Sequence, residues 1–147
     1  MAGPGERRGE VGHRQALQII TAILRAVEGD NLLPITVWVS DAHGDLKAAV
    51  RMDGAFLDTP LNAQRKAYTA ARGGSRTTRE LRARVDQAPV DAHCFDPRFT
   101  YFGGGVKVVV DGQVLGAVGV SGRPEPGEDE RLAVLGIRAA YPKAELP

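Results

Sequence analysis

Lys66 stands in a pattern that would place its amine against a closely packed surface. It lies on a predicted helix whose inner face carries only small side chains, namely Ala63, Ala67, Ala70 and Ala71. Such a face lets a helix lie very close to another element, and a lysine held there would be desolvated. Desolvation lowers the pKa of an amine, which suits it to proton transfer or to binding an anion. The alternatives are that Lys66 extends to solvent or pairs with a carboxylate such as Asp53.

Three further polar side chains could join Lys66 in one site. We predict that Asp53 and Tyr68 assist Lys66 in catalysis and that Ser121 helps to bind the ligand. These residues come from different parts of the chain, so their convergence depends on the fold.

A run of three glycines at residues 103–105 offers main-chain groups for binding. Gly104 and Gly105 could present backbone N–H groups to an oxyanion, or they could only form a tight turn into a strand. The run precedes a predicted strand rather than a helix, so it lacks the helix N-terminus that phosphate binding would need.

The chain contains three histidines, His13, His43 and His93. An axial haem ligand needs an accessible imidazole nitrogen beside an apolar slot. His43 and His93 lie on predicted loops that could reach the glycine-rich stretch, so we predict that these two bind a cofactor. The alternative is that all three are solvated surface residues. His93-Cys94 is not a metal motif, because no second Cys or His stands at ligand spacing, and we predict no metal site.

Arginines surround the same helix, at Arg51, Arg65 and Arg72, and Arg123 follows further along the chain. Guanidinium groups pair well with carboxylates, such as those of haem or of a small acid. We predict Arg51 as the ligand-binding member of this group. The alternative is that all are ordinary surface charges.

The element that must position these residues is a predicted β-hairpin within residues 103–122. Asp111-Gly112 supplies the positive φ values of a type I′ turn. Further glycines lack side chains where a helix or a ligand could approach the backbone, at Gly116, Gly119 and Gly122. We predict this hairpin at the centre of the sheet and as one wall of any pocket.

The remaining elements flank that hairpin. A helix is predicted over residues 14–28, with a buried stripe of Leu17, Ile20, Leu24 and Val27. The elements that follow are strands 35–39 and 46–52, a helix from an N-cap at Thr59 to Arg72, a helix over 78–87 with a Thr77–Glu80 capping box, a connection over 89–101, and, after the hairpin, a helix over 128–140. Antiparallel strand pairs with helices between them favour an α+β fold.

Composition limits the classes of function. The 147 residues are 43% hydrophobic and 25% charged, which predicts one domain over residues 13–147 after a flexible tail over 1–12. A net charge of +1 gives no reason to expect a nucleic acid or an anionic membrane as partner. Residues 1–8 lack the apolar core of a secretory signal, and a single cysteine excludes an internal disulfide. We therefore expect a cytoplasmic protein.

Five fragments occur in an order that resembles the GlcG/HbpS family, which includes the C-terminal domain of PduO. They are Arg51-Met52-Asp53-Gly54-Ala55, Ala63 with Lys66-Ala67-Tyr68-Thr69-Ala70, Gly104-Gly105, Asp111-Gly112 with Gly116–Gly122, and Asp129 with Ala133 and Gly136. The resemblance covers residues 17–140. It implies a profilin-like α–β–α sandwich around a five-stranded antiparallel sheet, and a homo-oligomer. Several members of the family bind haem, degrade haem or have a corrinoid-related function, so the resemblance implies one of these roles as well.

Three hypotheses on function follow. The first is a protein that binds a small ligand or cofactor, with haem as the leading candidate. The second is a small cofactor-independent biosynthetic enzyme of the isomerase, lyase or cyclase type, in which Lys66 acts on a carboxylated or unsaturated metabolite. The third is an accessory subunit without a ligand, whose small-residue faces are oligomer contacts.

Overall fold

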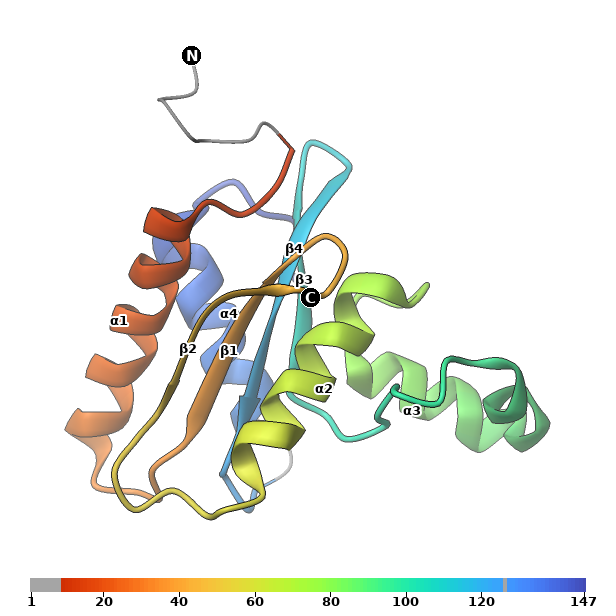
Figure 1. The fold of residues 1–147 in the computed structure, drawn as a ribbon, viewed down its shortest axis with the longest axis horizontal. Coiled ribbons are helices and arrows are strands. Elements are labelled where there is room, and N and C mark those ends of the chain that lie inside the picture. The colour runs from red at the N-terminus through yellow and green to blue at the C-terminus, as the bar shows by residue number, and fades with distance from the viewer. Residues whose placement is uncertain (1–8, 126) are drawn as a thin grey trace.

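The computed structural model describes residues 9–125 and 127–147 (Figure 1). The elements run in the predicted order of helix, hairpin, two helices, hairpin and helix. They are α1 (His13–Asp30), β1 (Thr36–Asp41), β2 (Leu46–Arg51), α2 (Thr59–Arg72), α3 (Thr78–Gln87), the 3₁₀ turn η1 (Pro89–Cys94), β3 (Gly105–Val110), β4 (Gln113–Ser121) and α4 (Glu128–Ala140). Within these described residues, no helix is both long and apolar enough to cross a membrane.

The fold is α+β, with an antiparallel sheet in the order β2-β1-β4-β3. The described residues form four strands, so the five strands that the resemblance implied are wrong for this part of the chain. The physical reason is visible in the sequence, where only the two hairpins carry a β-pattern and the long 89–101 connection begins as a 3₁₀ turn. We predicted the 105–121 hairpin at the centre of the sheet, but only one of its strands is central. Strand β4 lies between β1 and β3, whereas β3 is an edge strand.

The two faces of the sheet differ in side-chain size, because successive residues of a strand point to opposite faces. One face is rich in valine and packs against α1 and α4, which contact each other on that side. Its fully buried members include Val37, Val108 and Val118, packed with Ile23 and Ile137 of the two helices. The opposite face is covered by α2, and where β4 meets this helix it carries small residues, Ala117, Gly119 and Ser121. In Figure 1 the sheet lies between these two helical layers.

Helix α2 lies very close to the sheet, as its small face predicts. Ala63 and Ala67 are fully buried. A side chain at Gly119 would overlap the Ala63 carbonyl oxygen, and one at Gly105 would overlap the Lys66 carbonyl oxygen. These two glycines therefore allow the helix backbone to approach the β3–β4 hairpin, and this approach places Lys66 beside the sheet.

Several local predictions are confirmed. Asp111 and Gly112 have φ values of 51° and 75°, as a type I′ turn requires. The hydroxyl of Thr77 accepts the Glu80 N–H at 3.1 Å and caps α3. Helix α4 has the predicted bounds.

Others are corrected. Leu17 is 54% exposed, because the buried stripe of α1 is formed by Ala16, Ile19, Ile20, Ile23 and Val27. Thr59 is the first residue of α2 rather than its N-cap, and its hydroxyl donates to the Phe56 carbonyl at 2.7 Å. Val11, in the segment predicted as a tail, is buried and donates its N–H to the Leu115 carbonyl at 2.9 Å; residues 1–8 lie outside the described part.

Candidate functional site

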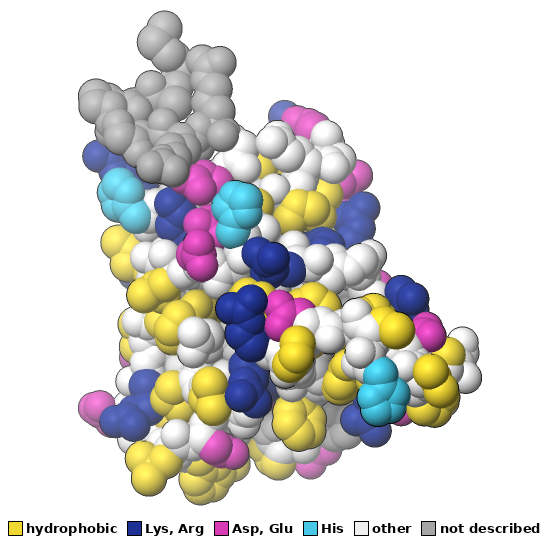
Figure 2. Space-filling model, turned by 45° about the vertical axis from the view of Figure 1, so that its right-hand side comes forward, with side chains coloured by type: hydrophobic (Ala, Val, Ile, Leu, Met, Phe, Trp, Pro, Cys, Tyr) yellow, Lys and Arg dark blue, Asp and Glu magenta, His cyan; other side chains and the backbone are white. Residues whose placement is uncertain are grey.

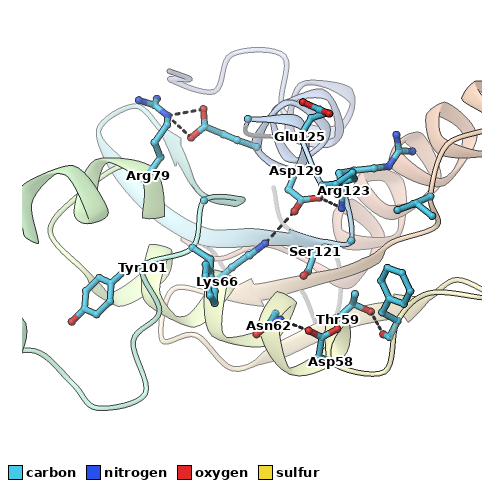
Figure 3. Close-up of a pocket in the computed structure, with 18 of the residues that line it drawn as sticks. Asp58, Thr59, Asn62, Lys66, Arg79, Tyr101, Ser121, Arg123, Glu125 and Asp129 are labelled. Carbon is cyan, nitrogen blue, oxygen red and sulfur yellow. Dashed lines mark hydrogen bonds and ion pairs between the residues drawn. The ribbon is translucent and has the colours of Figure 1, made fainter. Parts of the chain in front are cut away.

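A cavity of about 610 Å³ opens beside the first turns of α2 (Figure 3). Its wall is completed by residues of α3, the 101–103 segment, the end of β4 and the start of α4. Apolar and aromatic side chains lie along part of the wall, namely Leu33, Phe56, Tyr101 and Phe102. Polar groups occupy the rest, so the cavity offers an apolar surface and hydrogen-bonding groups to the same ligand.

Lys66 reaches this cavity from α2 and is only 3% exposed. Its Nζ donates to the Val120 carbonyl oxygen at 2.8 Å and to Asp129 Oδ2 at 3.2 Å. An ammonium group has three donors, so one N–H remains for a ligand. Burial lowers the pKa of Lys66, and the charge of Asp129 partly opposes that shift. Lys66 is thus a desolvated amine with an unused donor.

Asp129 lies in the first turn of α4 and completes the ion pair. Its Oδ1 accepts the Arg123 N–H at 3.1 Å, while Oδ2 accepts from Lys66. Burial raises the pKa of Asp129, and the Lys66 charge acts in the opposite direction. Each side chain therefore offsets the charge of the other, since either one alone would be a buried, unpaired charge.

Gly104 packs directly against this ion pair. Its φ of +123° lies in a region that disfavours other residues. A Cβ at this position would lie 2.6 Å from the Val120 carbonyl oxygen, 2.9 Å from Asp129 Cβ and 3.0 Å from Lys66 Nζ. The absence of a side chain at Gly104 is what lets the lysine amine reach its two acceptors.

Charges at the cavity mouth are largely paired. Arg79 of α3 donates to Glu130 of α4 at 3.1 Å, and Figure 3 marks this ion pair with dashed lines from Arg79. The lining holds four cations, Lys66, Arg79, Arg82 and Arg123, and four carboxylates, Asp58, Glu125, Asp129 and Glu130. Their formal sum is zero, so the cavity attracts no polyanion through net charge.

Arg123 binds within the protein. Its guanidinium is buried and donates to Asp30 Oδ2 at 2.9 Å, tying the β4–α4 connection to the end of α1. In Figure 3 the Arg123 side chain points away from Lys66. Its contribution to the cavity is the backbone N–H that holds Asp129.

Some residues singled out in the sequence come together here. Lys66 and Ser121 line the cavity, and Gly104 packs against the Lys66 amine. Gly105 lies beneath the Lys66 backbone, and its N–H donates to the Thr78 hydroxyl at 3.0 Å rather than to the cavity.

Tyr68 and His43 belong to a different cluster. Tyr68 donates its hydroxyl to Asp96, and the guanidinium groups of Arg98 and Arg72 lie 4.5 and 5.4 Å from its ring centre. Arg72 also donates to the His43 carbonyl oxygen at 3.3 Å. Burial raises the pKa of Tyr68, and the hydrogen bond to Asp96 adds to that shift. Neither Tyr68 nor His43 lines the cavity.

Asp53, Arg51 and His93 also lie outside the cavity lining, and all three are exposed. The carboxylate that pairs with Lys66 is Asp129, not Asp53. No histidine of the described residues lines the cavity, and no group of three or more His, Cys, Asp or Glu side chains in that part of the chain could hold a metal ion.

The sequence reasoning did not identify Asp129 as the partner of Lys66. The residue was visible as part of the family pattern and as an acid in the first turn of a predicted helix. Asn62 and Thr59 were missed as well, although both line the cavity one or two turns before Lys66 on α2. Their helical spacing from Lys66 was the available signal.

Comparison with known proteins places this chain in a family. Residues 11–138 match the family model described as haem degrading protein HbpS-like. Protein GlcG of Escherichia coli K12 is 39% identical over 107 residues, covering 71% of this chain and 78% of GlcG.

Solved structures agree with that match. An HbpS double mutant of Streptomyces reticuli superposes with a TM-score of 0.79 at 29% identity, over 93% of this chain and 91% of the other. The haem complex of PduOC superposes with a TM-score of 0.80 at 26% identity, over 93% of this chain and 98% of the other.

Proposed function

Because the chain belongs to the HbpS-like family, we propose that it is a small-molecule-binding protein whose ligand occupies the cavity over Lys66. The observation that carries this proposal is the Lys66 amine. It is almost fully buried, it is held in place by two acceptors, and it keeps one donor for a ligand. A buried charge kept in such an arrangement is costly unless it is satisfied, so the third donor favours a bound oxygen acceptor.

The cavity lining suggests the chemistry of the ligand. A carboxylate oxygen would accept from Lys66, and the Ser121 hydroxyl and the Asn62 amide are further polar groups of the same wall. A flat apolar body would pack on Phe56 and Phe102. Arg79, Arg82 and Arg123 are paired with Glu130, Asp86 and Asp30, so the Lys66 amine is the cation of the lining that is left to meet a ligand, and the cavity suits one carboxylate better than several. The proposed ligand is therefore a monocarboxylic acid with an aromatic or unsaturated body.

The two residues predicted to assist Lys66, Asp53 and Tyr68, lie outside the cavity lining. The role of the cavity residues is to bind and orient the ligand. Asp129 and the Val120 carbonyl hold the amine, and the apolar wall limits the access of water.

Haem is the second candidate ligand, favoured by the family match and by the PduOC haem complex. An imidazole-ligated haem does not fit the cavity over Lys66, because His13, His43 and His93 are exposed and none lines it. Haem held by one of these histidines would bind at the surface instead. A surface haem site and the Lys66 cavity would therefore be two different sites, and each is tested by its own substitutions. We also propose that the protein is cytoplasmic, because its single cysteine suits a reducing compartment.

The test of the main proposal is isothermal titration of the protein with a panel of aromatic and aliphatic monocarboxylic acids. At least one acid should bind the wild type and lose most of its affinity in Lys66→Met. Lys107→Met is the matched control, because Lys107 is another buried lysine of the described part but lies outside the cavity lining. Equal affinity in wild type and Lys66→Met would reject the site.

The test of the haem proposal is an absorbance titration with haemin. A stoichiometric Soret shift that is removed by one of His13→Ala, His43→Ala or His93→Ala would identify a surface haem site. A weak shift that is indifferent to all three substitutions would exclude imidazole-ligated haem.

A further inference from the structure

The cavity lining holds two carboxylates for which no cation is left. All the cations of the lining are paired, and two of them, Arg82 and Arg123, take their carboxylates from outside the lining. The lining carboxylates that remain are Asp58 and Glu125, and neither has an ion-pair partner among the described residues. A ligand that brings a positive charge would therefore find a counter-charge in this wall.

These two carboxylates do not belong to a large surface field of one sign. The chain has a net charge of +1, and Figure 2 shows positive and negative side chains interspersed on the face in view. The selection of a charged ligand therefore depends on individual side chains of the lining and on which of them are paired.

Asp58 lies on the same side of α2 as Lys66. Asp58, Asn62 and Lys66 are four residues apart in turn, all three line the cavity, and Figure 3 shows them one after another along the helix. Eight residues of helix rise about 12 Å, and the Lys66 side chain shortens that span because side chains on a helix lean toward its N-terminus. Burial lowers the pKa of Lys66, and the charges of Asp129 and then of Asp58 oppose that shift. Asp58 is thus near enough to act on the amine without pairing with it.

The protein itself makes little use of the Asp58 carboxylate. Its one side-chain hydrogen bond comes from Asn62 Nδ2 to Oδ2 at 3.5 Å, and it caps no N–H of α2. A neutral amide at that distance leaves the charge of the carboxylate uncompensated. An acid at a helix N-terminus also interacts favourably with the helix dipole, but that role does not require the side chain to line a cavity.

We propose that the ligand of this cavity is a zwitterion, with a carboxylate held by Lys66 and a cationic group held by Asp58. This inference rests on the proposed function, because Lys66 supplies one end of the site. The two charged groups lie at opposite ends of a flat apolar body of about one aromatic ring, which packs on Phe56 and Phe102. Asp58 then determines specificity, because it distinguishes an amino acid of this shape from a plain acid of the same length.

Two probes of equal length test this selectivity by isothermal titration at pH 7. They are 4-(aminomethyl)benzoic acid and 4-ethylbenzoic acid, which differ only in an ammonium group in place of a methyl group. Wild type should bind the amino acid about three- to fivefold more tightly, as expected for an ion pair at a cavity rim. Asp58→Asn should remove this preference while its affinity for 4-ethylbenzoic acid stays unchanged. Asp53→Asn is the matched control, because Asp53 is exposed and lies outside the cavity lining, and it should keep the preference.

The outcomes separate this inference from the proposed function. Equal affinity of wild type for the two probes, with both lost in Lys66→Met, would overturn the zwitterion and leave the carboxylate site standing. A preference that survives Asp58→Asn, or that is lost in Glu125→Gln instead, would overturn the assignment to Asp58. If neither probe binds wild type while another acid binds through Lys66, the zwitterion is again overturned. If no acid depends on Lys66, the proposed function fails and this inference fails with it.

Discussion

Lys66 and Asp129, which are 63 residues apart in the chain, form a buried ion pair with Nζ and Oδ2 at 3.2 Å. The pair joins α2 on one face of the sheet to α4 on the other, at the end of β4. Because each charge is satisfied by the other and by main-chain groups, the amine can be kept in a buried position at the cavity wall.

Breaking this pair should cost more than replacing both partners. Asp129→Asn leaves the lysine charge buried without a counter-charge, and Lys66→Met does the same to the carboxylate. Each should lower the free energy of unfolding by about 3–5 kcal/mol. The double variant Lys66→Met with Asp129→Leu should lose less than the sum, as measured by urea denaturation. Additive losses would show that the two side chains are not coupled in the folded protein.

Lys66 should also make stability depend on pH. Burial lowers the pKa of Lys66 in the folded state, whereas in the unfolded chain it keeps its ordinary value of 10.5. Between the two pKa values the unfolded chain binds more protons, so the free energy of unfolding contributed by Lys66 rises with pH in this window. The difference between wild type and Lys66→Met should increase as the pH is raised toward 10.5. Urea denaturation at stepped pH measures it, and a falling difference would contradict the buried amine.

Gly104→Ala should disturb the amine directly. It puts a side chain on a backbone with a φ of +123° and places a methyl group against Lys66 Nζ and the Val120 carbonyl. Gly112→Ala is the matched control for the φ effect, because Gly112 has a φ of +75° with nothing within 4 Å. Gly112→Ala should cost about 1–2 kcal/mol, and Gly104→Ala should cost more and also weaken ligand binding. Equal losses of stability in thermal denaturation would mean that the close contact of residue 104 with Lys66 and Val120 has no effect.

Lys107 should be important for stability but not for binding. Its Nζ donates to the Ala70 carbonyl oxygen at 2.6 Å and also to the Gly73 carbonyl, at the C-terminal end of α2. Lys107→Met removes both bonds and should cost about 1–3 kcal/mol. Carboxylate binding by the cavity should be unchanged in calorimetry. A loss of affinity as large as that of Lys66→Met would show that binding reports only on the stability of α2.

Tyr68→Phe separates the cavity from the cluster on the other side of α2. The substitution removes the hydroxyl that donates to Asp96 and keeps the ring between Arg72 and Arg98. Ligand affinity should equal that of wild type, while the 95–100 segment should become more sensitive to proteolysis. A large loss of affinity would instead connect Tyr68 to the binding site.

The order of the elements and the burial of Lys66 could be predicted because both depend on local spacing. The small face of α2 follows from alanines at helical intervals, and the 110–113 turn follows from Asp111-Gly112. The prediction of five strands was wrong, and it came from the family resemblance; the β-patterns of the residues themselves indicated only the four strands of the two hairpins.

The composition of the site could be predicted only in part. The Lys66–Asp129 contact depends on tertiary packing over a long separation, and no local pattern indicates it. The separation of Tyr68 from Lys66 could have been predicted, because residues two apart on a helix do not share a face. The exposed positions of His43, in the β1–β2 turn, and of His93, in the 3₁₀ turn after α3, depend on how these segments pack, which spacing does not determine.

The most direct test of the central claim is an NMR titration of protein labelled with carbon-13 at the lysine Cε. The chain has four lysines, Lys47, Lys66, Lys107 and Lys143, each assignable by a single substitution. A binding monocarboxylic acid should shift the Lys66 resonance strongly and leave that of Lys107 in place. A bound acid that leaves the Lys66 resonance unmoved would contradict the account.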